Sequence, residues 1–153
     1  MCTRPTTGLL PPSLPVRALG DADVPALLAL DRAVLGCERG AMLRARLAER
    51  DAACVADDGA GGLAGFAISL DQRGIRQVGP LVARDAGVAT ALVQGIAAGA
   101  AQLRLDVVGA HASFAASLGF EVRARRAEMS LADRPMPWAE RSERFGLAAQ
   151  AYG

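Results

Sequence analysis

The stretch VGPLVARDAGVATALV, residues 78–93, decides the fold. It begins as an apolar strand, turns at Arg84-Asp85 and continues as a run of small and aliphatic residues typical of a helix. The unpaired N–H groups that open a helix lie at the positive end of its dipole and bind phosphate well. Gly87 and Ala89 would let such a ligand approach the backbone closely. Gly and Ala are common throughout the chain, so the position between a strand and a helix, more than the spacing, predicts a phosphate-binding turn.

Length and composition narrow the class of protein. A chain of 153 residues suits one domain. The formal net charge is +1 and no basic block appears, so we expect no nucleic-acid partner. Residues 86–103 carry no charge, but their large apolar side chains are separated by Ala, Gly, Thr and Gln. This composition predicts a buried helix and no membrane span. The three cysteines, Cys2, Cys37 and Cys54, form no metal-like pair, so we expect no metal site and a reducing, cytoplasmic compartment.

The apolar patterns predict a mixed α/β fold (α+β): a mostly antiparallel sheet with helices on both faces. Residues 1–13 are expected to be a disordered leader, 14–131 the domain, and 132–153 a tail that adds a last strand, FGLAAQ, to it. The helix after the fourth strand should return the chain parallel to that strand. Strands are predicted over 14–18, 54–56, 63–70, 75–82, 103–107 and 120–131, and helices over 24–35, 39–50, 87–101 and 110–117.

Five motifs in this order resemble the GNAT superfamily of acetyl-CoA-dependent N-acetyltransferases. They are VRALGDADVPALLALD (16–31), GLAGFAIS (62–69), VGPLV (78–82), GVATALV (87–93) and SLGFEV (117–122). The chain looks most like a bacterial branch with a G-P-L-V fourth strand and an aspartate in the first helix. The resemblance implies a GNAT-like fold, acetyl-CoA as co-substrate and a small amine as acceptor.

The resemblance also implies where acetyl-CoA binds. In that superfamily the fourth and fifth strands diverge, and the pantetheine arm lies between them like an extra strand. Carried over, Leu81 and Val82 would offer backbone groups to the arm, and an N–H near Val82 would stabilise the oxyanion. The pyrophosphate would lie on the turn formed by Arg84, Asp85, Ala86, Gly87, Val88, Ala89 and Thr90. The turn is shorter than is usual in the superfamily, which puts the side-chain role of Arg84 in question.

The general acid of the superfamily, a tyrosine near the end of the last helix, is absent. Ala115 and Ala116 occupy that region, and the only tyrosine is Tyr152. His111, the only histidine, is a candidate acid or base, because an ordinary imidazole pKa of about 6.5 suits amine chemistry. The alternative for His111 is a helix cap or a partly buried hydrogen-bonding group.

Asp31 is the second catalytic candidate. It lies on the apolar stripe of the first helix, and an inward carboxylate needs a partner or a wet groove. It either binds or deprotonates the amine, or it pairs with Arg32, Arg39 or another arginine.

These observations predict an acyl-CoA-dependent N-acyltransferase in which the amine attacks the thioester directly within a ternary complex. One rival is a related domain that binds CoA for sensing without catalysis, which the missing tyrosine favours. The other is a partner module without a cofactor, which the short turn favours. Trp138, Phe145 and Tyr152 are expected to pack, with a homodimer contact or the acceptor site as alternatives.

Overall fold

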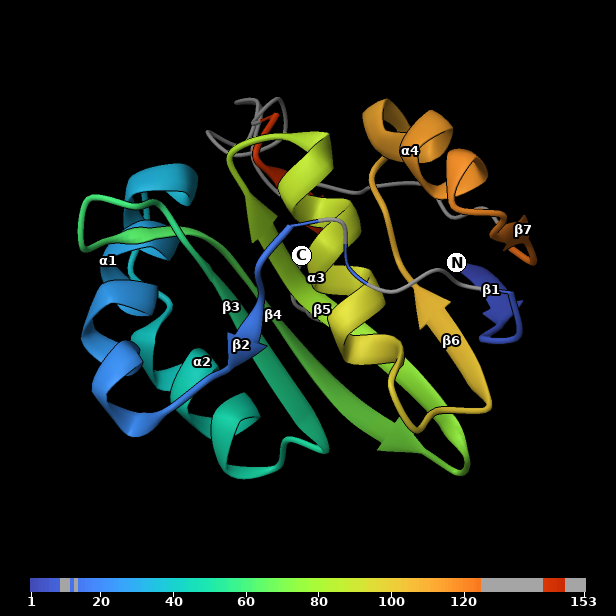
Figure 1. The fold of residues 1–153 in the computed structure, drawn as a ribbon, viewed down its shortest axis with the longest axis horizontal. Helices are drawn as coiled ribbons and strands as arrows, with labels where there is room; N and C mark the ends of the chain where they lie inside the picture. The colour runs from blue at the N-terminus through green and yellow to red at the C-terminus, as the bar shows by residue number, and fades with distance from the viewer. Residues whose placement is uncertain (9–11, 13, 125–141, 148–153) are drawn as a thin grey trace, which may run out of the picture.

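The computed structural model describes residues 1–8, 12, 14–124 and 142–147. Within them an eight-stranded mixed sheet carries helices on both faces, which confirms the predicted fold class (Figure 1). Every strand pair is antiparallel except β5 with β6. The strands are β1 (Cys2–Pro5), β2 (Arg17–Ala18), β3 (Ala52–Asp57), β4 (Leu63–Gln72), β5 (Ile75–Ala83), β6 (Gln102–Leu105), β7 (Glu121–Val122) and β8 (Arg144–Gly146). The helices are α1 (Val24–Leu35), α2 (Gly40–Ala48), α3 (Ala86–Ala97) and α4 (Ala112–Ser117).

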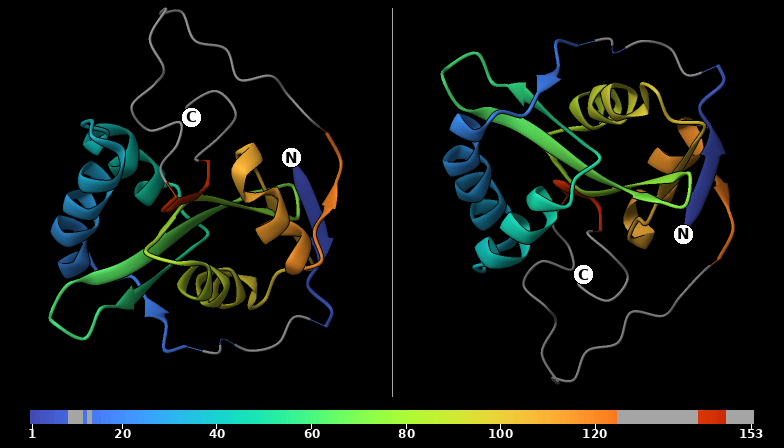
Figure 2. Two further views of the ribbon diagram at one scale, coloured as in Figure 1. Left: turned by 90° about the horizontal axis from the view of Figure 1, so that it is seen from above. Right: turned by 90° about the horizontal axis from the view of Figure 1, so that it is seen from below.

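The two faces of the sheet are covered by different helices, with α3 on one face and α1 and α2 on the other (Figure 2). Alternation along β4 divides the core, because successive strand side chains point to opposite faces. Phe66 and Ile68 pack with the leucines of α1 and α2, whereas Ala67 packs with Leu92 of α3. Phe114 of α4 joins the core of α3. Among the described helices, none has the length and apolar composition needed to cross a membrane.

The prediction of a disordered leader over residues 1–13 is wrong for Cys2–Pro5. These residues form β1, which lies between β6 and β7 and pairs antiparallel with both. Cys2 is buried opposite Leu105. The four-residue strand is too short to show an alternating pattern, and its stability comes from partners about a hundred residues further along the chain. Further along, just before β2, the side chain of Val16 lies close to Gly95 of α3.

Other predicted elements exist with shifted ends. The first predicted strand, 14–18, is limited to β2, and helix 110–117 begins as a 3₁₀ turn at Gly109–His111 before α4. Strand 120–131 is seen as β7, and its residues 125–131 lie outside the described part. In the tail, β8 contains Phe145 and Gly146 of the predicted strand FGLAAQ and pairs with β5, and residues 148–150 of that prediction lie outside the described part. Trp138 and Tyr152 lie outside the described residues.

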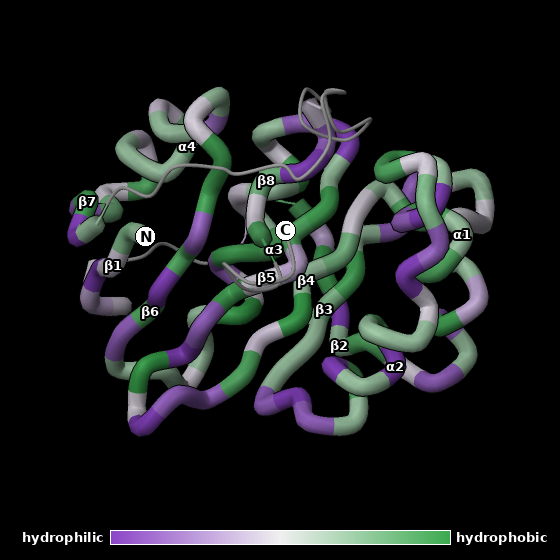
Figure 3. The backbone as a smooth tube through the Cα atoms, turned by 180° about the vertical axis from the view of Figure 1, so that it is seen from behind, coloured by the Kyte–Doolittle hydropathy of each residue, from purple (hydrophilic) through white to green (hydrophobic). Residues whose placement is uncertain are grey.

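Strand β5 changes its neighbour halfway along. Its first part, from Ile75 to Val78, pairs in parallel with β6. Beyond the Gly79–Pro80 peptide bond, which is cis, Leu81 and Val82 pair with β8. The crossover through α3 and the divergence of β5 from β6 are therefore as predicted. The place on β5 where the pantetheine arm was expected to lie like an extra strand is taken by β8 of the protein itself (Figure 3).

Candidate functional site

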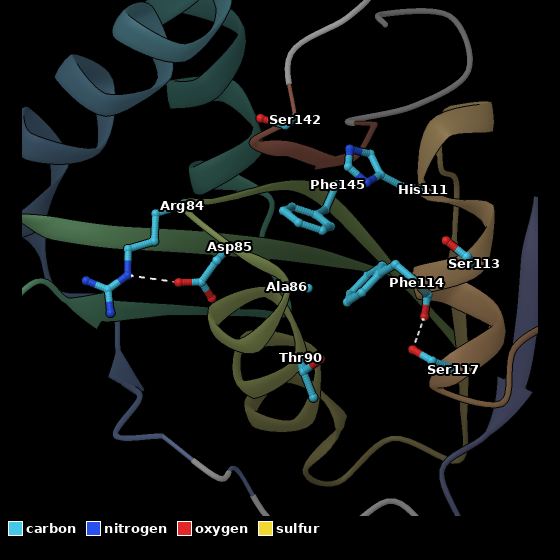
Figure 4. A pocket seen from close by; sticks show the side chains of 10 residues that line it. All are labelled: Arg84, Asp85, Ala86, Thr90, His111, Ser113, Phe114, Ser117, Ser142 and Phe145. Atoms are coloured by element: carbon cyan, nitrogen blue, oxygen red, sulfur yellow. Dashed lines mark hydrogen bonds and ion pairs between the residues drawn. The ribbon is translucent and has the colours of Figure 1, made fainter.

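A groove of about 510 Å³ lies between the first turns of α3, helix α4 and strand β8 (Figure 4). Five residues predicted from the sequence as cofactor-binding or catalytic line it together: Arg84, Asp85, Ala86, Thr90 and His111. The sequence analysis did not name Ser113, Phe114, Ser117 and Ser142, which line it as well, and it gave Phe145 only alternative roles. Helical spacing could have found Phe114, because residues three apart share a helix face and Phe114 follows His111 by three.

The N-terminus of α3 is capped by a carboxylate from the turn that precedes it. Asp85 is the N-cap, and its carboxylate accepts a hydrogen bond from the Val88 N–H at 2.8 Å. This bond holds the pKa of Asp85 below its ordinary value, and the Arg84 guanidinium, which donates to the same carboxylate at 3.1 Å, adds to the effect. A Cβ atom at Gly87 would lie 3.2 Å from that carboxylate, so glycine leaves it room. The predicted phosphate site thus has the positive end of the α3 dipole and the Arg84 guanidinium. A phosphate there would compete with the Asp85 carboxylate for the Val88 N–H.

Three aromatic rings form the side of the groove opposite α3. The ring centroids of His111 and Phe145 lie 4.3 Å apart, and Phe114 meets Phe145 edge-on at 4.8 Å. Figure 4 shows His111 and Phe114 on the α4 side, with Phe145 arriving from β8. His111 therefore lies in the wall of the groove beside Phe145 of β8, and its role as an acid or base stays a prediction.

The backbone of Leu81 and Val82 lies beside the groove rather than lining it. Both residues are fully buried, and both pair with β8. The next N–H along the strand, that of Ala83, donates to the Glu143 carbonyl oxygen at 2.9 Å. The sheet edge predicted to receive an extended ligand therefore carries a strand of the protein.

The helical residues Gly87, Val88 and Ala89 do not line the groove with their side chains. Val88 and Ala89 are buried in the α3 core. Their predicted role concerns backbone N–H groups only, and the Val88 N–H is bonded to Asp85 as described.

Asp31 is not brought to the groove. It is 1% exposed, and its two carboxylate oxygens accept hydrogen bonds from Arg39 at 2.6 and 3.1 Å. The arginine pairing that the sequence left open is therefore present. The contact links the last turns of α1 to the residue before α2.

A second buried carboxylate, which the sequence analysis did not single out, follows β6. Asp106 is 2% exposed and accepts hydrogen bonds from Arg104 at 2.8 Å and from Gln77 at 3.2 Å. Its backbone oxygen accepts the Leu147 N–H at 2.8 Å. The alternation in QLRLD could have indicated a polar face on β6. Among the residues that the structure describes, no group of three or more His, Cys, Asp or Glu side chains could hold a metal ion.

Solved structures of similar shape are acetyltransferases or are provisionally named as such. A GCN5-related N-acetyltransferase from Kribbella flavida is 23% identical with a TM-score of 0.52, over 67% of this chain and 28% of that one. A protein from Agrobacterium tumefaciens str. C58, provisionally named an acetyltransferase, is 21% identical with a TM-score of 0.57, over 76% of this chain and 99% of that one. Another from Deinococcus radiodurans R1 is 16% identical with a TM-score of 0.54, over 82% of this chain and 91% of that one. At such identities these likenesses support the fold.

The family is identified by comparison of the amino-acid sequence with family models. No functionally curated protein matches it significantly. The chain also spans only 28% of the length of the Kribbella flavida protein. The model of a family described as "Acetyltransferase (GNAT) domain" matches residues 27–144, which include most of α1, the turn before α3, His111 and the first residue of β8. The chain therefore belongs to the GNAT family of acetyltransferases, which are acyl-transfer enzymes.

Proposed function

We propose that this protein transfers an acetyl group from acetyl-CoA to a small amine by direct attack within a ternary complex. The observation that carries the proposal is the groove, which combines the N-terminal end of α3 with the hydroxyl-bearing face of α4 next to the divergence of β5 and β6. A helix N-terminus attracts phosphate through its unpaired N–H groups and its dipole. The nucleotide half of acetyl-CoA would lie there, and its pantetheine arm would follow β5.

Polar groups of the groove suit the phosphates of acetyl-CoA. Arg84 offers an exposed guanidinium beside the turn. Thr90 on α3 and Ser113 and Ser117 on α4 offer hydroxyl groups from two sides. In this proposal the N–H groups of the first turn of α3 donate to the pyrophosphate. A pyrophosphate oxygen then replaces the Asp85 carboxylate as the acceptor of the Val88 N–H.

The chemical step needs a base and an oxyanion donor. The amine nitrogen attacks the thioester carbonyl carbon, the C–N bond forms, the C–S bond breaks, and CoA leaves as a thiolate. A water molecule passes the amine proton to His111, the titratable base of the groove. The Ala83 N–H donates to the Glu143 carbonyl oxygen in this structure, and once released from it this N–H would stabilise the oxyanion. We assign Asp31 the lesser role of a positioning residue, because Arg39 holds its carboxylate.

The cytoplasm is the compartment we propose for this reaction. Cys2 and Cys54 are buried, Cys37 is partly buried, and all three are free thiols. Free thiols persist in a reducing compartment. Burial raises the pKa of Cys54 to about 12, which keeps its thiol protonated and unreactive.

Calorimetric titration with acetyl-CoA and with 3′-phospho-ADP, its nucleotide half, tests the proposal. Both ligands should bind, and Gly87→Glu, which puts a carboxylate on the turn, should abolish both. Ala98→Glu adds the same charge at the far end of α3 and serves as the control. The native protein should also acetylate amines, and His111→Ala should do so at a lower rate. That result would support the proposed role of His111 as the base. If 3′-phospho-ADP fails to bind the native protein, the proposal is wrong.

Two observations favour a second candidate, a domain that binds CoA for sensing and does not turn it over. The edge of β5 that should hold the pantetheine arm is occupied by β8, and α4 carries Ala115 and Ala116 where the superfamily has its tyrosine. Binding of 3′-phospho-ADP without acetyl transfer to any amine, in the native protein and in variants that open the gap, would support this candidate.

A further inference from the structure

The strand in the gap is an addition to the sheet and not a link in it. The hydrogen-bonded order β2-β3-β4-β5-β6-β1-β7 is continuous, and β8 lies off this path. Removing β8 would leave the pairing of β5 with β6 through Ile75–Val78 intact. The sheet therefore does not depend on β8 for its connectivity.

Strand β8 uses the groups that an extended ligand on β5 would need. Its register sets Gly146 opposite Leu81 and Arg144 opposite Val82. The Glu143 carbonyl oxygen accepts the Ala83 N–H, and the Leu147 N–H donates to Asp106 at the end of β6. An added strand and an amide-bearing chain compete for such an edge, because each backbone N–H and carbonyl group there is satisfied once.

The same segment also lines the groove. Ser142 and Phe145 line it, and Phe145 is 5% exposed between His111 and Phe114. The groove and the edge of β5 are thus separated by one short piece of chain.

We propose that residues 142–147 are an autoinhibitory strap, which occupies the slot of the pantetheine arm and must leave it before the acyl donor can bind fully. This inference rests on the proposed function, because it takes the donor to be acetyl-CoA. The strap competes with the arm and not with the nucleotide half. The apparent affinity for acetyl-CoA is therefore reduced by the fraction of molecules whose slot is open.

Gly146 gives a way to open the slot by one substitution. A Cβ atom there would lie 3.0 Å from the Leu81 Cβ and 3.1 Å from the Leu105 Cδ1. A branched side chain at this position would crowd Leu81 and Leu105 and so destabilise the strand in the slot. Gly20→Val is the matched control, because a Cβ at Gly20 would meet nothing closer than Asp23 Oδ2 at 3.7 Å.

The experiment compares acetyl-CoA with 3′-phospho-ADP by calorimetry in the native protein, Gly146→Val and Gly20→Val. We expect Gly146→Val to bind acetyl-CoA at least about tenfold more tightly than the native protein, with the affinity for 3′-phospho-ADP unchanged in all three. Unchanged or weaker acetyl-CoA binding by Gly146→Val, with 3′-phospho-ADP still bound, overturns the strap and leaves the proposed function standing. Failure of 3′-phospho-ADP to bind any of them overturns both.

Amide hydrogen exchange of the native protein provides a test that needs no variant. With saturating acetyl-CoA, the amides of Arg144–Leu147 should exchange faster than in the free protein, because the strap has left. The Ala83 amide should stay protected, because the thioester carbonyl oxygen of bound acetyl-CoA replaces the Glu143 carbonyl oxygen as its acceptor. If Arg144–Leu147 keep or gain protection when acetyl-CoA binds, the strap does not leave and the inference fails.

Discussion

The carboxylate of Asp31 accepts hydrogen bonds from both Nε and Nη2 of Arg39, at 3.1 and 2.6 Å. Asp31 is on α1, and Arg39 immediately precedes α2, so the pair fastens one helix to the next. Asp31 is almost fully buried and the side chain of Arg39 is 13% exposed. Removal of one partner from a buried pair leaves the other charge uncompensated, which is more costly than removing both.

Asp31→Ala should therefore lower the free energy of unfolding by about 3 kcal/mol, as measured by urea denaturation. The double variant Asp31→Leu with Arg39→Met should recover most of that loss, because no buried charge of the pair remains. Both proteins should bind 3′-phospho-ADP as the native protein does. A double variant that regains stability but has no acetyl-transfer activity would contradict a positioning role and place Asp31 in the chemistry.

Elements with a complete local pattern were predictable from the sequence, whereas elements made by distant pairing were not. The apolar stripe of α1, the alternation of β4 and the strand–turn–helix at 78–93 each signal their structure locally. β1 and β8 are short, and each is stabilised by an edge that forms elsewhere. No pattern within four residues indicates such an edge.

The same division applies to the site. The groove brings together Arg84, Asp85, Ala86, Thr90 and His111, because α3 and α4 begin at the same end of the sheet, which follows from the order of elements. The competition of Asp85 for the helix N–H groups is a capping bond, which an Asp directly before the helix favours. The occupation of β5 by β8 depends instead on the strand register, for which the sequence contains no signal at the scale of one residue.

The close packing of β4, β5 and α3 can be tested at Gly65. A Cβ atom there would lie 2.7 Å from the Val82 carbonyl oxygen and 3.0 Å from the Leu92 Cδ1, and the first of these is backbone that cannot give way easily. Gly65→Ala should lower the free energy of unfolding by about 1–3 kcal/mol in urea denaturation. Gly109→Ala, where a Cβ would meet nothing within 4 Å, is the control and should stay close to the native value. Equal stabilities for the two variants would disprove the contact.

The acid stability of the protein should depend on Asp23. Arg17 donates to its carboxylate at 2.7 and 2.9 Å and the Gly20 N–H at 2.8 Å, and these bonds lower its pKa to about 2. A carboxyl whose pKa is lower in the folded state stabilises the fold above its unfolded pKa and loses that effect as the pH falls toward its folded pKa.

The contribution should thus be complete above about pH 4 and disappear toward pH 2. We expect the difference in thermal midpoint between the native protein and Asp23→Asn to shrink over this interval, as followed by circular dichroism. A difference that stayed constant from pH 5 to pH 2 would show that the bond to Arg17 does not govern it.

Asp85 should stabilise α3 while opposing the phosphates of the donor. Asp85→Ser keeps an oxygen that can accept the Val88 N–H but removes the negative charge, whereas Asp85→Ala loses both. We expect the alanine variant to lose about 1 kcal/mol of stability and the serine variant much less. The serine variant should bind 3′-phospho-ADP about fivefold more tightly at low salt, which corresponds to about 1 kcal/mol at a helix terminus. Because exposed charges are screened, that gain should shrink as salt is added. Weaker binding by the serine variant at low salt would mean that the Asp85 carboxylate orients the turn for the phosphates instead of competing with them.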